Sequence, residues 1–317
     1  MKTRIPLATV WRFSRCLVLS ACFAPFLSGQ ELQPRAYVPT PVGLNYFGIS
    51  YSNNVGGLLF DPSLPVTDAR VDANAFTLAF GQTLGVFGRT AQALAVLPYL
   101  EAHLNGTVAD APQHQYRSGL GDATFRYAMN IYGAPAMSRK EFATFHEKTI
   151  VGASLTMTVP SGQYDPNKLL NIGTNRWGFK PEIGLTQAIG KWGLESAAGV
   201  WLHTANNGFA GNSVRTQIPL GSFQAHLVRN LPHRSWVAGD MTYFTGGRSQ
   251  VDGRNNADYI ASVRLGATLA VTLTPRQVIK ISYFDGAIAR IGADIRSIGI
   301  SYNIIWLKGE LNRRNRP

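Results

Sequence analysis

Between residues 260 and 273 the chain reads Ile260-Ala-Ser-Val-Arg-Leu-Gly-Ala-Thr-Leu-Ala-Val-Thr-Leu273, and this stretch decides the fold. Every second residue from Ala261 onward is apolar, and most of the residues between them are small or polar. A period of two over this length is typical of a β-strand with one apolar and one polar face. In a transmembrane β-barrel the apolar face contacts lipid and the polar face lines the lumen. The stretch therefore predicts one wall strand of such a barrel.

Similar alternating segments follow one another from about residue 44 to residue 307. The predicted strand cores are 44–53, 74–84, 92–104, 122–132, 150–159, 176–187, 192–203, 222–229, 236–245, 260–273, 278–284 and 297–306. Short turns and longer loops rich in Asn, Asp, Gly and Pro alternate between them, as at periplasmic and extracellular ends. The fold class predicted is all-β, a transmembrane up-and-down antiparallel β-barrel of about 12 strands. One long connection, 133–148, falls on the periplasmic side, and its capping box Ser138-Arg-Lys-Glu141 predicts a short helix.

The composition favours a membrane protein over a soluble one. Charged residues make up 15% of the 317 residues, whereas roughly 25% is usual in soluble domains. No run of 18 apolar residues follows residue 29, so no membrane-spanning helix is predicted there. A soluble β-barrel or sandwich would also show alternation, but it would not predict loops sorted by length. Nor would it predict aromatic residues at two levels, such as Trp192 and Trp306 at one end and Trp177 and Tyr243 at the other.

The N-terminus predicts a signal peptide over residues 1–29. Four basic residues precede an apolar run at 16–27, and Ser28-Gly29 follows it. The box Leu19-Ser-Ala-Cys22 leaves lipidation as an alternative. Both cysteines lie in this leader, so neither a disulfide nor a thiolate metal site is predicted in the exported chain. Loss of the leader takes the net charge from +12 to +8.

The remaining domain boundaries follow from the strand pattern. Residues 30–43 are predicted to form an N-terminal periplasmic segment, too short for a plug domain, although it could also thread into the lumen. Residues 44–307 are predicted to form the barrel, and residues 308–317 a basic, solvated C-terminal tail.

A basic net charge can indicate nucleic-acid binding. An exported chain does not routinely meet nucleic acid, so none is predicted as a partner.

Four segments carry a resemblance to a known family. They are residues 87–99, Ser118-Gly-Leu-Gly-Asp122, residues 149–165 and Asn175-Arg-Trp-Gly-Phe-Lys-Pro-Glu182. Together they resemble the outer-membrane proteins grouped as "putative MetA-pathway of phenol degradation", and the similarity covers roughly residues 32–306. The resemblance implies a β-barrel in the outer membrane of a Gram-negative bacterium that passes aromatic or other hydrophobic small molecules. It brings no catalytic residues.

Strand parity predicts which polar side chains face the lumen. The predicted lumen-lining and selectivity residues are Tyr99, Glu101, Asp122, Arg126, Arg176, Lys180, Glu182, Glu195, His226, Asp240, Arg264 and Lys280. A charged side chain facing lipid at mid-bilayer costs about 2–4 kcal/mol, which favours inward placement. Two interpretations stay open: the charges line a hydrated path, or they pair and fill the interior. Barrels of about eight strands are filled and those of 16–18 hold a channel, so twelve lies between.

Enzymatic sites are an alternative to a channel. His203-Thr-Ala-Asn-Asn-Gly208 is similar to the His-x-Ser-Asn-Gly signature of outer-membrane phospholipases, but Ala205 stands at the nucleophile position. His226 and Asp240 share parity on neighbouring predicted strands, with Thr242 or Ser222 as conceivable nucleophiles. The chain is predicted not to be an enzyme, and no cofactor or metal site is predicted. The acids Asp61, Asp68 and Asp72 lack the spacing of a calcium loop.

The predicted function is passive passage of small hydrophobic solutes, aromatic ones among them, across the outer membrane. A structural barrel with a closed lumen and a membrane-embedded lipid-modifying enzyme are the alternatives. The predicted partners are outer-membrane lipids, lipopolysaccharide and the solute itself. The sequence leaves the oligomeric state open.

Overall fold

A computed structural model describes residues 34–57, 66–108, 111–168, 171–289 and 294–307. The predicted signal peptide and the predicted C-terminal tail lie outside these residues. The strands of the main sheet are β1 (Leu44–Gly57), β2 (Val66–Val86), β3 (Arg89–Val108), β4 (Ala111–Leu120), β5 (Thr124–Tyr132), β6 (Thr149–Thr158), β7 (Gly178–Ile189), β8 (Trp192–His203), β11 (Leu220–Asn230), β12 (Trp236–Gly246), β15 (Ile260–Thr274), β16 (Gln277–Ala289) and β17 (Asp294–Leu307).

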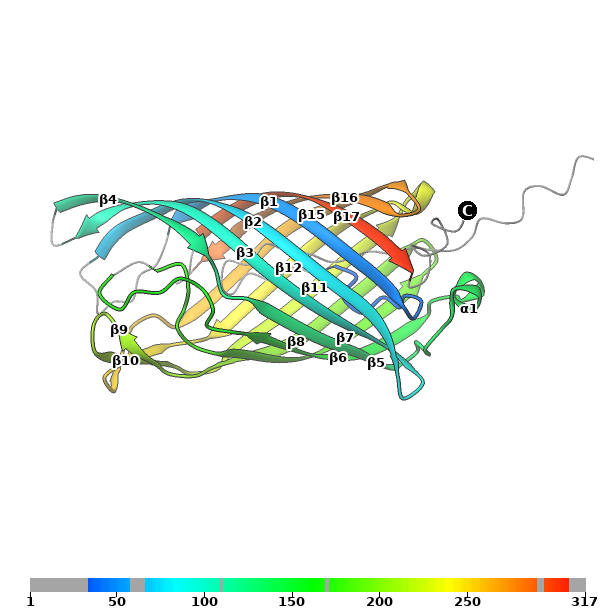
Figure 1. Cartoon of the computed structure of the whole chain (residues 1–317), viewed down its shortest axis with the longest axis horizontal. Coiled ribbons are helices and arrows are strands. Elements are labelled where there is room, and N and C mark those ends of the chain that lie inside the picture. Colours follow the sequence, from blue (N-terminus) through cyan, green and yellow to red (C-terminus); the bar gives the residue numbers. More distant parts are fainter. Residues whose placement is uncertain (1–33, 58–65, 109–110, 169–170, 290–293, 308–317) are drawn as a thin grey trace, which may run out of the picture.

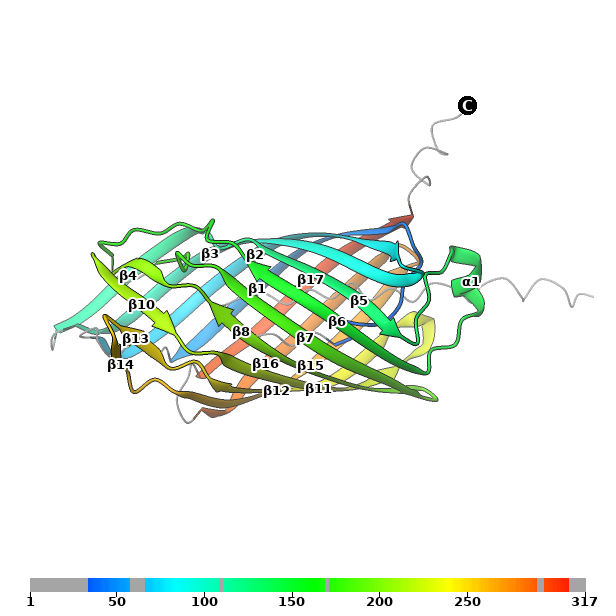
Figure 2. The same ribbon diagram turned by 90° about the horizontal axis from the view of Figure 1, so that it is seen from below.

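These thirteen strands close into an antiparallel barrel. The sheet order runs β2-β1-β17-β16-β15-β12-β11-β8-β7-β6-β5-β3-β4, and an additional pairing of β2 with β3 closes the ring. β4 and β5 both pair with β3, one after the other, so they are two halves of one wall strand interrupted at residues 121–123. The barrel wall therefore has twelve strands in the described chain, which confirms the predicted fold class. Figures 1 and 2 show that the strands run obliquely to the long axis of the barrel.

The side chains are distributed inside out relative to a soluble protein. Along β7, Ile183 is 54% exposed on the outer surface, while its neighbour Glu182 is buried inside. The same alternation places Leu78 outside and Thr77 inside on β2. On β17 it places Ile298 outside and Ser297 inside. So much exposed apolar surface around a whole barrel requires an apolar surrounding, because soluble monomers rarely expose patches larger than a few hundred Å². The outer wall is therefore the lipid-facing surface of a transmembrane barrel.

The two ends of the barrel differ. Turns of two to five residues join β2 to β3, β7 to β8, β11 to β12 and β15 to β16, the third of these turns carrying the 3-10 helix η1 (Pro232–Arg234). The first residue of β1 and the last residue of β17, Leu44 and Leu307, pair at this short-turn end. At the opposite, long-loop end a second sheet contains β9 (Asn206–Phe209), β10 (Ser213–Gln217), β13 (Ser249–Val251) and β14 (Arg254–Asn255). The sequence analysis predicted only loops at this end, and it did not predict β4.

The predicted short helix is confirmed as α1 (Arg139–Thr144). Ser138 caps it: the backbone N–H of Ser138 donates to Glu141 Oε2 at 2.7 Å, and the N–H of Glu141 donates to Ser138 Oγ at 3.4 Å. This is a complete capping box. α1 projects beyond the short-turn end of the barrel (Figures 1 and 2). Within the described ranges, no helix is long and apolar enough to cross a membrane.

Candidate functional site in the barrel lumen

The lumen is lined by an apolar zone and a charged zone. The apolar zone consists of buried residues near the short-turn end, namely Leu44, Tyr46, Ala79, Leu94, Val96, Val228, Trp236, Ala238, Ala270, Val278 and Ile305. A smaller apolar cluster, Trp201, Leu220 and Phe244, lies near the long-loop end. The inward positions of Trp201 and Phe244 are those that strict alternation requires. A solute crossing the barrel would therefore meet apolar surface on both sides of the charged zone.

The charged zone is a buried ion cluster centred on Glu182. Lys180 Nζ donates to Glu182 Oε2 at 2.6 Å, and Arg126 Nη2 lies 3.9 Å from Glu182 Oε1. Gln224 Nε2 donates to the same carboxylate at 3.1 Å. Buried charges are tolerated only when opposite charges and hydrogen bonds compensate their lost hydration. The cluster meets this condition in part: Glu182 accepts hydrogen bonds from Lys180 and Gln224, whereas Arg126 Nη2 lies within ion-pair distance but forms no hydrogen bond.

Residues 34–43 lie inside the barrel against this cluster. The sequence analysis assigned this segment to the periplasm and left insertion into the lumen as the alternative, and the described residues follow that alternative. Tyr37 is the central contact. Its hydroxyl donates to Glu182 Oε1 at 2.8 Å and lies 2.9 Å from Ser154 Oγ. The Arg126 guanidinium carbon is 5.0 Å from the centre of the Tyr37 ring, within cation–π range. The phenol therefore belongs to the ion cluster, through one hydrogen bond to Glu182 and a ring contact with Arg126.

Two glycines form the slot that holds the Tyr37 ring. A Cβ on Gly152 would lie 2.2 Å from Tyr37 Cδ1, and a Cβ on Gly184 would lie 2.1 Å from Tyr37 Cε2. These two residues are directly paired across β6 and β7. Any larger residue at either position would exclude the ring. β6 and β7 thus leave space for the Tyr37 side chain, although Tyr37 is more than a hundred residues away in the sequence.

Further hydrogen bonds hold the same segment along its length. The backbone N–H of Arg35 donates to Glu195 Oε2 at 2.5 Å, and Arg35 Nη1 donates to Asn230 Oδ1 at 2.9 Å. Asn130 Nδ2 donates to the carbonyl of Tyr37 at 3.1 Å. Side chains from β5, β8 and β11 therefore anchor one extended segment across the lumen.

The remaining inward charges bond to the wall and to each other. His226 Nδ1 lies 2.7 Å from Asp240 Oδ1, and Thr268 Oγ1 donates to Asp240 Oδ2 at 2.8 Å. Arg264 Nη2 donates to the carbonyl of Ile295 at 2.7 Å. The ammonium of Lys280 lies 5.9 Å from the ring centre of Trp236. The predicted pairing of His226 with Asp240 is therefore present, as a bridge between β11 and β12.

Eight of the predicted lumen residues are buried or nearly buried and inward-facing: Arg126, Lys180, Glu182, Glu195, His226, Asp240, Arg264 and Lys280. Parity put Tyr99 and Glu101 on the wrong face. Tyr99 is 37% exposed on the outer side of β3, opposite Phe76, and Glu101 shares that face opposite Asn74. The rule of polar side chains inward fails on β3 because Leu100 and Ala102 fill the lumen there.

Asp122 and Arg176 also differ from the prediction, because both lie outside the strands. Asp122 sits in the break between β4 and β5 and accepts from the backbone N–H groups of Gly162 and Thr174 and from Thr174 Oγ1. Arg176 belongs to the loop before β7. Asp122 therefore organises the long loop to which Arg176 belongs. The described residues contain no group of three or more His, Cys, Asp or Glu that could hold a metal ion.

Sequence reasoning missed the lumen contacts of Arg35 and Tyr37. One signal was available: Gly152 and Gly184 have inward parity on neighbouring predicted strands. Two facing glycines leave room in the lumen, but they do not reveal what occupies it.

Comparisons with known proteins agree with this architecture. The profile of the family described as "Putative MetA-pathway of phenol degradation" matches residues 45–287. Among solved structures, the COG4313 outer membrane channel from Pseudomonas putida F1 superimposes with a TM-score of 0.73 at 19% identity, covering 87% of this chain and 100% of that chain. The β domain of the Bordetella autotransporter BrkA gives a TM-score of 0.48 at 12% identity, covering 83% and 99%. No curated protein matches the chain.

Proposed function

The chain belongs to the family described as "Putative MetA-pathway of phenol degradation", and we propose that it is an outer-membrane channel for passive passage of small hydrophobic solutes, aromatic ones among them. The fold of the COG4313 outer membrane channel from Pseudomonas putida F1 supports the channel part of this proposal. The apolar zones on both sides of the charged zone support the choice of solute. No energy-coupling element is needed for such passage.

One observation carries the proposal: an extended segment, rather than wall side chains alone, fills the middle of the lumen. Tyr37 occupies a slot that Gly152 and Gly184 leave open in the wall. A barrel needed only as a scaffold could fill this space with wall side chains, as small barrels do. A segment that enters from one end is a removable constriction, so residues 34–43 set the size of the path.

Planar-bilayer conductance and liposome swelling test this function. The wild-type protein is expected to form a narrow channel. Tyr37→Ala removes the phenol from the slot and is expected to raise the single-channel conductance, and removal of residues 30–43 should raise it further. The matched control Tyr283→Ala changes an exposed tyrosine on the outer face of β16 and should leave conductance unchanged.

The structural-barrel alternative has an observation in its favour, namely the density of buried contacts at the level of Glu182. Absence of permeability in both the wild type and the variant lacking residues 30–43 would establish this alternative. The lipid-modifying alternative predicts phospholipid hydrolysis that is lost in His203→Ala. In the structure, His203 stacks on Trp201 with 5.8 Å between ring centres, and Thr204 Oγ1 accepts from the N–H of Trp177, which are structural contacts.

A further inference from the structure

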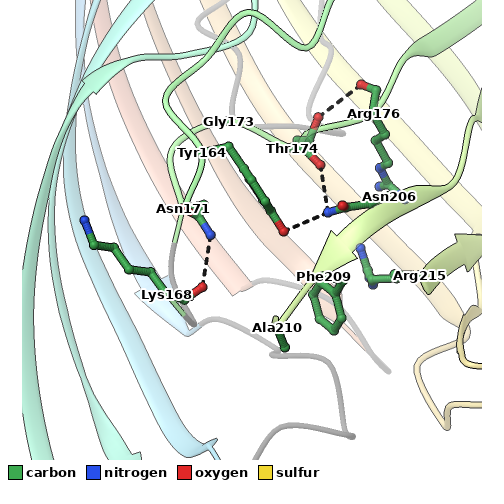
Figure 3. Close-up of a pocket in the computed structure, with 10 residues that line it drawn as sticks. All are labelled: Tyr164, Lys168, Asn171, Gly173, Thr174, Arg176, Asn206, Phe209, Ala210 and Arg215. Carbon is green, nitrogen blue, oxygen red and sulfur yellow. Dashed lines mark hydrogen bonds between the residues drawn. The ribbon is translucent and has the colours of Figure 1, made fainter. Parts of the chain in front are cut away.

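A cavity of about 160 Å³ lies among the loops at the long-loop end of the barrel. The loop of residues 159–177 forms one side, and β9 and β10 form the other. Figure 3 shows Tyr164, Lys168 and Arg176 from the first side, with Phe209 and Arg215 from the second, arranged around it. None of these residues belongs to the lumen cluster. The cavity is therefore a separate site at the outer entrance of the barrel.

The cavity wall is cationic. Lys168, Arg176 and Arg215 line it, and no acidic residue lines it within the described part of the chain. Two nearby carboxylates, those of Asp165 and Asp122, do not line the cavity. Asp165 is 3.4 Å from the ammonium of Lys168, and Asp122 already accepts three hydrogen bonds from the loop backbone and Thr174. The two arginines consequently give the cavity a positive potential.

Arg176 lacks a full set of partners. Its Nη1 atom is buried and forms no hydrogen bond. Burial and the charge of Arg215 together lower the pKa of Arg176 to about 9, against the opposite effect of Asp122. A buried cation without hydrogen bonds is costly. An anion in the cavity would supply both a counter-charge and acceptors in the bidentate geometry that guanidinium groups favour.

Aromatic rings form another part of the wall. The guanidinium carbon of Arg215 lies 5.5 Å from the centre of the Phe209 ring, which fixes the two side chains relative to each other. Tyr164 is oriented by two hydrogen bonds, one donated to the carbonyl of Gly208 at 3.0 Å and one accepted from Asn206 Nδ2 at 2.9 Å. A cavity of about 150 Å³ is large enough for one benzene ring. The volume here therefore suits a single ring bearing one small anionic group.

We propose that this cavity binds small aromatic carboxylates, with the carboxylate held by Arg176 and Arg215 and the ring against Phe209. The inference rests on the proposed channel function, for which it names the solute class and a capture site before the lumen. The ring supplies the apolar part of the solute, and the carboxylate supplies the selectivity.

Calorimetric titration of the purified full-length protein in detergent tests the site, with benzoate as the probe and benzamide and acetate as controls. Benzoate is expected to bind, and each control, lacking the charge or the ring, is expected to bind at least about tenfold more weakly. Arg176→Gln and Arg215→Gln should each weaken benzoate binding by about tenfold or more. Arg254 is an exposed arginine of the second sheet that does not line the cavity, so Arg254→Gln should leave benzoate binding unchanged.

Phe209→Leu provides a second variant that keeps both charges. It should reduce the preference for benzoate over acetate without abolishing acetate binding. Potassium chloride conductance of the same preparations separates the two proposals. Channels that conduct but bind benzoate no better than benzamide would overturn the aromatic carboxylate site and leave the channel intact. Benzoate binding lost in Arg176→Gln, in a protein without conductance, would support the site and overturn the channel.

Discussion

The ion cluster of the lumen and the outer cavity present the same kinds of residue in opposite states. In the lumen, Lys180 and Arg126 share the carboxylate of Glu182, and Tyr37 packs beside them. In the outer cavity, Arg176 has a buried Nη1 without a hydrogen bond and lines a cavity of about 160 Å³. A cation predicted to face inward can therefore be part of a sealed structural cluster or of an available site. Only its partners distinguish the two.

Breaking the sealed cluster should have the largest effect. Glu182→Gln removes the single carboxylate that serves Lys180 and Arg126, and loss of one partner of a buried ion pair typically costs about 3–5 kcal/mol. A fall of this size in the free energy of unfolding in urea is expected. Arg176→Gln is the matched comparison in the outer cavity and should change it by less than about 1 kcal/mol. Equal losses for the two variants would contradict the distinction.

Overfilling the slot of Tyr37 should have the next largest effect. Gly184→Ala places a methyl group where the ring lies, and overpacking typically costs about 1–3 kcal/mol. Tyr37→Ala in the same chain should relieve most of the added cost, because the clash is removed with the ring. Unfolding of the two single variants and the double variant measures this coupling. Gly239→Ala is the control, since its Cβ would meet no atom within 4 Å.

Loosening the outer loop should have a smaller and more local effect. Asp122→Asn replaces a carboxylate that accepts three hydrogen bonds at residues 162 and 174. Loss of charge-assisted bonds should destabilise the loop by about 1–3 kcal/mol. Hydrogen exchange should quicken at Thr174, and benzoate affinity should fall as the cavity wall loosens. Unchanged exchange at Thr174 would show that Asp122 does not hold the loop.

The smallest expected effect is a pH dependence in the same loop. The backbone N–H of Asn167 donates to Asp165 Oδ1 at 3.0 Å, and this bond, with help from Lys168, lowers the pKa of Asp165. The resulting stabilisation is present above the unfolded pKa of about 3.9 and is lost as the pH falls through the lower folded pKa. NMR titration of the Asp165 carboxyl should give a midpoint below about 3.9. A midpoint at or above that value would contradict the assignment.

The wall strands could be predicted because every residue in the membrane contributes to the alternation. The stretch from Ile260 to Leu273 lies entirely within β15 (Ile260–Thr274). β4 was missed because Pro112 through Tyr116 are all exposed, so no contrast between lipid and lumen marks its faces. Tyr99 and Glu101 were misplaced because parity assigns the faces of a strand correctly only if the lumen is known to be polar at that level.

The candidate sites were predictable only in part. Charged inward residues such as Lys180 and Glu182 follow from the cost of exposing charge to lipid. Tyr37 could not be placed, because its position depends on a slot that β6 and β7 create only when they are paired. The cationic cavity escaped notice for a similar reason: Arg176, in the loop before β7, and Arg215, on β10, are far apart in the sequence and line one cavity only in the folded chain.

The position of Tyr37 in its slot also has a consequence for the order of folding. Tyr37 bonds to Glu182 across 145 positions of sequence, and Arg35 bonds to Glu195 across 160. Contacts between such distant positions require closure of a long loop and therefore form late. β6, β7 and β8 must be in register before the slot exists. Insertion of the N-terminal segment is thus expected to be the last event of assembly, and to occur only in chains whose wall strands have paired correctly.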